Sequence, residues 1–300
     1  MLCDICRVHQ AFYRRRFEGV RLCKTCFKKS FENKVRRTIL EHRMLSRDDH
    51  LGVAVSGGKD SLTLLYILKK IGARFPDFRL SILTVDEGIE GYREESLNIA
   101  HAYCKSIGIP IKVFSFKETF GSTLDEIVEE KKESHPCSLC GVMRRRMMDI
   151  GARRMNVDKL ATAHNLDDEL QTFFLNIFHG EPGRIGRNKP FLDGSNGTFV
   201  VRIKPFHRVL EREISLYAFL SGIPFQESPC PYANTSLRND VRRFLDEMEN
   251  RHPGAKYMAY NAINKLRALP TTVKKKSFTN CVLCGSPSSN QICSVCKIID

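Results

Sequence analysis

Residues 51–61, LGVAVSGGKDS, decide the fold. Residues 51–55 form a short apolar run rich in valine, which is typical of a buried strand. Two glycines follow at once, and the amphipathic stretch after them carries leucines at positions 62, 64, 65 and 68. The segment therefore predicts a strand over 51–55, a tight glycine turn and a helix over 60–71.

The glycine turn has the chemistry of a phosphate-binding loop. Gly57 and Gly58 let the backbone turn tightly and bring its N–H groups close to a ligand, and the N-terminus of the following helix favours an anion. Lys59 adds a positive charge, and Ser56 and Ser61 add hydroxyl donors. A Walker P-loop has a different spacing between its glycines. An ordinary strand-to-helix turn is the alternative, but the flanking residues favour a nucleotide site.

The alternation of strands and helices continues along the chain. Such alternation predicts a parallel α/β sheet with helices on both faces. The further strands are expected at 79–85, 111–115, 158–163 and near 199–203, and the helices between them at 93–107, 122–133 and 166–178.

Ligands of parallel sheets bind beyond the carboxyl ends of the strands. Asp86 follows the second strand, where it also fits a turn or a helix cap, and His164 and Asp168 follow the fourth. Asp168 lies in an acidic first helical turn, a position that favours acids in any case. The predicted nucleotide-binding residues are Ala54, Val55, Ser56, Gly57, Gly58, Lys59, Asp60, Ser61, Val85, Asp86, His164 and Asp168.

Length, composition and charge narrow the class of protein. Three hundred residues, 42% of them hydrophobic, allow one large domain with small appendages. The sequence has no apolar run of the ~18 residues that a membrane helix needs, and its first residues, MLCDICRVHQ, do not read as a signal peptide. We expect a cytoplasmic protein with no membrane partner. The net charge of +14 favours a polyanionic partner, most often nucleic acid, over a merely solvated basic surface.

Eight of the twelve cysteines form two quartets. In a cytoplasmic chain, cysteines at metal-ligand spacing indicate metals rather than disulfides. Each quartet consists of two CxxC pairs, sixteen residues apart in the first and eight in the second. This spacing predicts a structural four-thiolate Zn²⁺ site in each. The predicted ligands are Cys3, Cys6, Cys23, Cys26, Cys281, Cys284, Cys293 and Cys296.

Three further cysteines have a different pattern. Cys137 and Cys140 form a CxxC at the start of a predicted helix, and Cys230 stands alone between two prolines. Three thiolates suit a [4Fe–4S] cluster with one open iron, which can bind an external sulfide. Persulfide chemistry also needs thiolates near the substrate, so these residues leave both chemistries open. Cys104 lies in a helical pattern and is expected to be a small buried residue.

The pattern divides the chain into four parts. A zinc finger is expected at 1–30 and a catalytic domain at 31–232, which begins with a linker helix over 31–47. A helical tail is expected at 233–272, with helices over 236–250 and 255–268, and a zinc ribbon at 273–300. The stretch 180–198 is loop-like because it is rich in glycine.

Four motifs between the two cysteine quartets carry a family resemblance. SGGKDS matches the pyrophosphate-binding loop, SGGxDS, that many adenylating enzymes share. Together with HPCSLCG, ATAHNLDDE and SPCPY, it resembles the TtuA/Ncs family of tRNA 2-thiouridine synthetases. The resemblance covers nearly the whole chain. It implies a PP-loop domain of the adenine nucleotide α-hydrolase type, flanked by two zinc modules.

The resemblance also implies a reaction. ATP–Mg²⁺ places its pyrophosphate on residues 56–61, and O2 of a tRNA uridine attacks the α-phosphate. A sulfur nucleophile then attacks C2, and AMP leaves. Lys59 and the loop amides stabilise charge on the phosphates, while Arg144 and Asp168 assist near the reacting base.

The sulfur chemistry, too, comes from the resemblance. The family holds a [4Fe–4S] cluster on Cys137, Cys140 and Cys230, and the open iron presents hydrosulfide. The donor is a ubiquitin-like protein thiocarboxylate or free sulfide, and the enzyme is expected to be a homodimer. The zinc modules and the helical tail are expected to contact the tRNA.

The target uridine and two rival functions remain open. The 27% charged residues and the low glutamine content are typical of a thermophile. Because thermophiles use thiolation of position 54 to stabilise tRNA, U54 is favoured over the wobble U34. An adenylating enzyme acting on another substrate without an iron–sulfur cluster would not need the three cysteines. A non-catalytic RNA-binding protein with zinc modules would not need the phosphate loop.

Overall fold

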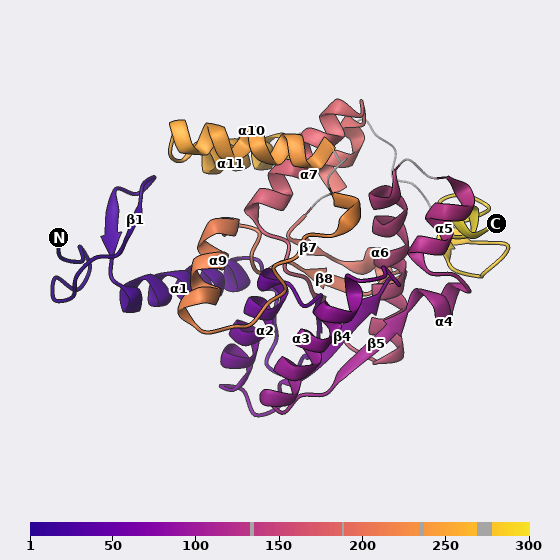
Figure 1. Ribbon diagram of the computed structural model, residues 1–300, viewed down its shortest axis with the longest axis horizontal. Coiled ribbons are helices and arrows are strands. Elements are labelled where there is room, and N and C mark those ends of the chain that lie inside the picture. Colours follow the sequence, from indigo (N-terminus) through magenta and orange to yellow (C-terminus); the bar gives the residue numbers. More distant parts are fainter. Residues whose placement is uncertain (133–134, 188, 234–236, 269–277) are drawn as a thin grey trace.

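Strand β3 lies in the middle of the sheet on which the molecule is built (Figure 1). The computed structural model describes residues 1–132, 135–187, 189–233, 237–268 and 278–300. Within them the sheet has six strands in the order β5-β4-β3-β6-β8-β7. All neighbours pair in parallel except the edge strand β7, which pairs antiparallel with β8 and was not predicted. The strands are β3 (His50–Ala54), β4 (Arg79–Asp86), β5 (Ile111–Ser115), β6 (Lys159–Ala161), β7 (Phe191–Leu192) and β8 (Val201–Ile203).

Helices cover both faces of the sheet, as predicted. Successive residues of a strand point to opposite faces, so Ile82 belongs to one hydrophobic core and Leu83 to the other. The first face packs against α2 (Lys59–Gly72), α3 (Arg93–Ser106) and α9 (Glu211–Leu220). The second packs against α4 (Phe116–Phe120), α5 (Leu124–Lys131) and α6 (Pro136–Arg154). Burial on both faces explains why β3 is an unbroken apolar run.

Three helices form a third core at one end of the sheet, where Figure 1 shows them side by side. They are α7 (Leu166–Phe178), α10 (Leu237–Arg251) and α11 (Ala255–Ala268). Leu170 of α7, Leu245 of α10 and Ile263 of α11 are buried together. The buried Lys256 pairs with Asp167 at the start of α7 and thereby ties α11 to it. The carboxyl end of β6 is therefore backed by these helices.

The first cysteine quartet is continuous with the main domain. Strands β1 (Tyr13–Arg15) and β2 (Val20–Leu22) form a hairpin, and α1 (Lys24–Glu41) follows. The linker helix predicted over 31–47 is wrong at both ends. It begins earlier because Cys23 caps it by accepting the Cys26 N–H, and it ends earlier because Arg43 takes a left-handed φ of 47°. Phe31 of α1 stacks on Tyr217 of α9, with ring centroids 4.4 Å apart.

The second quartet lies against the outer side of α6. It is built from β9 (Thr279–Asn280), β10 (Pro287–Ser288) and α12 (Cys296–Ile299). Cys293 and Val295 share a hydrophobic core with Met143 and Met147 of α6. Arg146, also on α6, donates a hydrogen bond to Ser286. The quartet therefore supports the helix that begins with Cys137 and Cys140.

Two other stretches differ from the sequence-based expectation. The loop-like stretch 180–198 contains a 3₁₀ helix (Pro182–Arg187), β7 and the short helix α8 (Gly194–Gly197). Helix α9 was not predicted, because basic and apolar residues alternate up to its start. The predicted boundary between the tail and the zinc ribbon, at 272/273, lies outside the described residues. Among the described helices, none combines the length and the apolar character needed to cross a membrane.

The phosphate loop gives the first testable prediction. Gly57 has φ +85°, and a Cβ there would lie 2.3 Å from the Ser96 carbonyl oxygen of α3. We expect Gly57→Ala to lower the free energy of unfolding by about 2 kcal/mol or more, because strain and a backbone clash add. Gly58→Ala is the matched control, since its Cβ would meet only the Ser56 Oγ, at 3.5 Å. Urea denaturation of the two variants checks this, and equal stabilities would contradict it.

Candidate active site

One cavity of about 760 Å³ opens beyond the carboxyl ends of β3, β4 and β6. This is where a parallel sheet is expected to bind its ligand. Most of the predicted site residues line it. They are Ala54, Val55, Ser56, Gly58, Lys59, Asp60, Ser61, Val85, Cys137, Arg144, His164 and Asp168.

The remaining predicted residues lie just behind the cavity wall. Gly57 faces α3 rather than the cavity. Asp86 accepts the Gly88 N–H at 2.9 Å and therefore serves the turn after β4. Cys140 is buried and Cys230 half-buried, both beside Cys137.

The loop carbonyls are held away from the cavity. Ser56 O accepts from Arg93 at 2.9 Å, and Gly57 O accepts from the Gln226 N–H at 3.1 Å. Gly58 O accepts from the Ser61 hydroxyl at 2.9 Å. A carbonyl oxygen pointing at a phosphate would repel it, so this arrangement leaves the N–H side of the loop for an anion.

Lys59 stays charged at the mouth of the loop. Its ammonium lies 2.7 Å from Glu211 and 3.3 Å from Asp60. Burial by itself lowers the pKa of Lys59, but attraction to the two carboxylates more than offsets this and leaves the pKa raised. The cavity thus holds a fixed cation next to the loop amides.

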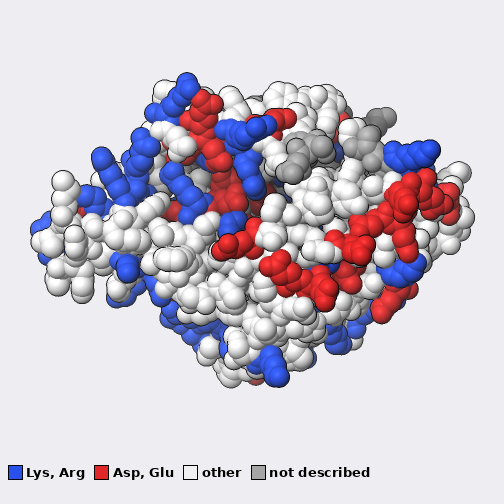
Figure 2. Space-filling model, in the orientation of Figure 1, with Lys and Arg blue, Asp and Glu red and all other residues white. Residues whose placement is uncertain are grey.

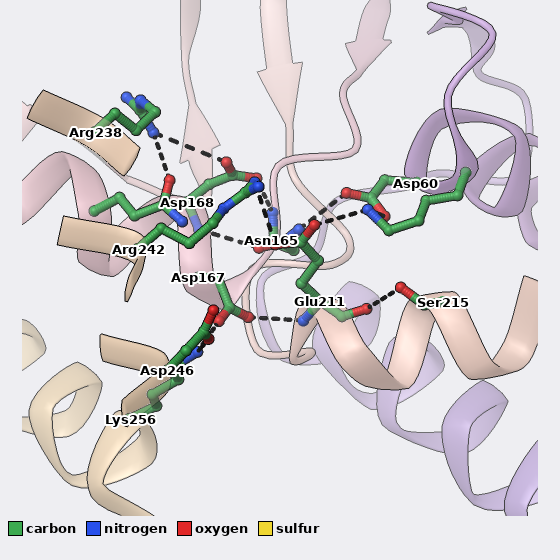
Figure 3. A network of polar contacts seen from close by, with 12 residues as sticks. Asp60, Asn165, Asp167, Asp168, Glu211, Ser215, Arg238, Arg242, Asp246 and Lys256 are labelled. Atoms are coloured by element: carbon green, nitrogen blue, oxygen red, sulfur yellow. Dashed lines mark hydrogen bonds and ion pairs between the residues drawn. The ribbon is translucent and has the colours of Figure 1, made fainter. Parts of the chain in front are cut away.

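Carboxylates from three elements lie close to one another (Figure 3). Asp60 begins α2, Asp168 lies in the first turn of α7 and Glu211 begins α9. Asp60 Oδ2 accepts from the Asn165 side chain at 3.1 Å, and its buried Oδ1 lies 3.3 Å from the Lys59 ammonium. Burial raises the pKa of Asp60 to about 7 and also raises that of Asp168. Two carboxylates that line the cavity beside a phosphate loop are suited to a divalent cation.

His164 is a neutral group on the cavity wall. Its Nδ1 lies 2.9 Å from the Thr162 hydroxyl. Desolvation by the surrounding protein is the main cause that lowers the pKa of His164, and the positive charge of Lys204 lowers it further. A neutral imidazole can contact a base or ribose without adding charge.

The three remaining cysteines meet where α6 begins. Cys137 Sγ lies 3.2 Å from the carbonyl of Tyr232, two residues after Cys230. Arg144 lies one turn along α6 and donates to Cys140 Sγ at 3.1 Å. In the described part of the chain these three cysteines form no group with all sulfurs within 4.8 Å of one another. They are thus spaced more widely than the ligands of a single ion.

The two terminal quartets have the opposite geometry. In each, all four sulfurs lie within 4.8 Å of one another. Individual pairs are 3.9 Å apart for Cys6–Cys23 and 3.7 Å for Cys284–Cys293. Four thiolates about 2.3 Å from a tetrahedral zinc ion lie about 3.8 Å from one another. The quartets therefore fit one zinc ion each.

Sequence reasoning missed several charged residues of the site. Glu87 directly follows Asp86, so the end of β4 was a signal for it. Arg93 lies within a predicted helix, and nothing in the sequence around it indicates a role in the site. Glu211 and Arg238 come from distant parts of the chain, and only the tertiary fold brings them to Lys59 and Asp168.

The raised pKa of Asp60 predicts a pH dependence. Between the unfolded value near 4 and the folded value of about 7, the folded state binds one more proton than the unfolded state. The stability of the wild type relative to Asp60→Asn should therefore fall by up to about 1.4 kcal/mol per pH unit as the pH rises toward 7, and level off above it.

Urea denaturation in magnesium-free buffer between pH 5.5 and 8.5 measures this difference. Asp77→Asn, at an exposed position, is the control and should give no such slope. A relative stability that stays constant, or rises with pH, would refute the prediction.

Comparisons with known proteins place the chain in a family. The model of the PP-loop domain matches residues 27–249. The tRNA-5-methyluridine(54) 2-sulfurtransferase of Pyrococcus horikoshii is 35% identical over 99% of this chain and 93% of its own. Cytoplasmic tRNA 2-thiolation protein 1 of Saccharomyces cerevisiae is 33% identical over 100% of this chain and 86% of its own.

A solved structure agrees with these relatives. It is the U34-tRNA thiolase NcsA from Methanococcus maripaludis with its [4Fe–4S] cluster, 34% identical, with a TM-score of 0.84. The match covers 99% of this chain and 95% of that one. The family expected from the four sequence motifs is thereby confirmed: the chain belongs to the PP-loop family, and within it to the tRNA 2-thiolation proteins.

Proposed function

We propose that this protein is a tRNA 2-sulfurtransferase that first adenylates O2 of a uridine and then transfers sulfur to C2. The observation that carries the proposal is that Ser56, Lys59 and Cys137 line the same cavity. An adenylating enzyme without sulfur chemistry needs no thiols there. A non-catalytic RNA-binding protein needs no phosphate loop.

The phosphate loop and its carboxylates serve the adenylation. The amides of residues 56–61 and the Lys59 ammonium bind the pyrophosphate and stabilise the charge that develops as O2 attacks the α-phosphate. Asp60 and Asp168 would hold Mg²⁺, because both carboxylates line the cavity beside the phosphate loop. That ion, when bound, neutralises phosphate charge. Glu211 fixes the position of the Lys59 ammonium through an ion pair of 2.7 Å.

The cysteines serve the sulfur transfer. Cys137, Cys140 and Cys230 would hold a [4Fe–4S] cluster, since their spacing is wider than one ion requires and the NcsA structure is described with such a cluster. The cluster, when bound, supplies an iron without a protein ligand that can carry sulfur. In this proposal the sulfur comes from a ubiquitin-like protein thiocarboxylate or from sulfide, and the enzyme works as a homodimer in the cytoplasm, the location named for the yeast relative.

The surface charge supports one direction of approach for tRNA. Figure 2 shows basic side chains gathered between the N-terminal module and α10, with a stripe of acidic side chains among them, and acidic side chains over α4 and α5. The exposed basic residues include Arg14, Arg16, Lys24, Lys29, Arg242, Arg243 and Arg251. We propose that the zinc module at 1–30 and the helical tail at 233–272 contact the tRNA backbone, while residues 31–232 carry out the chemistry. Residues 278–300 of the predicted ribbon pack on α6.

The target position is the finer part of the proposal. Relatives named for U54 and U34 are 35% and 34% identical to this chain, so similarity gives the two positions equal weight. The preference for U54 stays a prediction from the composition. Mass spectrometry of tRNA fragments from the reaction below decides between the two.

The decisive experiment is anaerobic purification with iron analysis and a thiolation assay. We expect about four irons per chain and ATP-dependent 2-thiouridine formation when sulfide is supplied. Cys137→Ser should lose both the iron and the product, whereas Cys104→Ser, a buried cysteine outside the cavity, should keep both. Iron-free wild type that still thiolates tRNA would leave only persulfide chemistry. Wild type that makes no product would end the proposal.

The two quartets give a separate prediction. Metal analysis should find two Zn²⁺ per chain, and Cys293→Ser should retain only one. Because Cys293 belongs to the same hydrophobic core as Met143 of α6, this variant should also lower the melting temperature. Two zinc ions retained by Cys293→Ser would contradict the assignment.

A further inference from the structure

Glu87 connects the phosphate-loop side of the cavity to the side where the cysteines lie. It follows β4 and is only 3% exposed. Its Oε1 lies 2.6 Å from Arg144 Nε, and its Oε2 lies 2.8 Å from Arg93 Nε. A single buried carboxylate therefore bridges Arg93, which donates to the phosphate loop, and Arg144, which lies beside the cysteines.

Arg93 is held by many other groups. Its guanidinium donates to Ser56 O at 2.9 Å, to Ser96 Oγ at 2.8 Å and to Thr84 Oγ1 at 3.0 Å. It also donates to the carbonyl of Val85. Without Glu87, these four acceptors would still hold Arg93 and, through it, the phosphate loop.

Arg144 is held by far less. Its side chain is 47% exposed, toward the cavity that it lines. Besides Glu87, its polar contact within the described residues is Cys140 Sγ, at 3.1 Å. A half-exposed arginine has many rotamers, so the buried carboxylate is what fixes the direction of its guanidinium.

We propose that Glu87 is a positioning residue for sulfur transfer, which orients the Arg144 guanidinium between Cys140 and the cavity so that it holds an anionic sulfur next to C2 of the activated uridine. This inference rests on the proposed function. In the step, hydrosulfide gives an electron pair to C2, the C2–O2 bond breaks with its pair leaving on AMP, and the S–H proton passes to water. Nothing is oxidised or reduced.

The asymmetry between Arg93 and Arg144 makes the inference testable with Glu87→Gln, which keeps the shape and removes the charge. The assay is single-turnover thiolation at saturating ATP, with enzyme whose iron has been reconstituted. We expect a fall of about tenfold or more in the thiolation rate, because a misplaced group commonly costs that much. Affinity for a non-hydrolysable ATP analogue should change less than about threefold, since Arg93 keeps its other acceptors.

Four further variants separate positioning from a structural role. Glu90→Gln, an exposed neighbour with the same change of charge, should behave as wild type. Glu87→Asp keeps the charge and should restore part of the rate, which also covers the case in which Glu87→Gln folds poorly. Arg144→Gln should be as slow as Glu87→Gln, and the double variant no slower than either, because the two act as one unit.

A second readout does not depend on turnover. The electron paramagnetic resonance spectrum of the reduced cluster should change in both Glu87→Gln and Arg144→Gln, because each alters a donor to a cluster sulfur. It should stay as in wild type in Glu90→Gln, with equal iron content throughout.

Each contrary outcome has a distinct meaning. If the rate loss of the double variant equals the product of the two single losses, Glu87 does not act through Arg144. If the ATP affinity of Glu87→Gln falls as much as its thiolation rate, Glu87 only stabilises the phosphate loop and does not position Arg144. A wild type that neither binds iron nor thiolates tRNA would overturn the proposed function itself, and this inference with it.

Discussion

The close approach of the phosphate loop to the backbone of α3 is the constraint on which the rest of the site depends. At Gly57 there is no room for a Cβ, so the loop can turn only in this way. The turn places Ser56 O on Arg93 and Gly57 O on the Gln226 N–H. With its carbonyls held from behind, the loop presents N–H groups to the cavity.

The buried charges of the site follow from the same arrangement. Arg93 is buried where it reaches Ser56 O, and a carboxylate beside a buried guanidinium stabilises its charge. Glu87 supplies it and at the same time reaches Arg144. On the other side of the loop, Lys59 forms ion pairs with Asp60 and Glu211. The polar groups that support the loop are therefore also the groups that connect it to the cysteines and to α9.

Local signals in the sequence were sufficient for most of the sheet. The apolar run of β3 and the glycine turn predicted β3 and α2 within a residue or two, because burial on both faces leaves an unambiguous pattern. Helix α1 was misplaced because the metal-ligand cysteines also form its cap, which periodicity does not detect. Glu211 and Arg238 were missed because their roles exist only once α9 and α10 pack beside α7. The roles of the cysteines and of Asp168 stay predictions that the experiments above test.

The packing of the last cysteine quartet on α6 has a consequence for biosynthesis. A ribosome makes α6 long before residues 278–300, so Met143 and Met147 have no cover from Cys293 and Val295 during most of translation. The helix that begins with Cys137 and Cys140 can reach its final packing only after the quartet has been made and has closed. Cys137, Cys140 and Cys230 therefore reach their final arrangement only near the end of synthesis. A nascent chain stalled before the quartet would expose its thiols to oxygen on an unsupported helix.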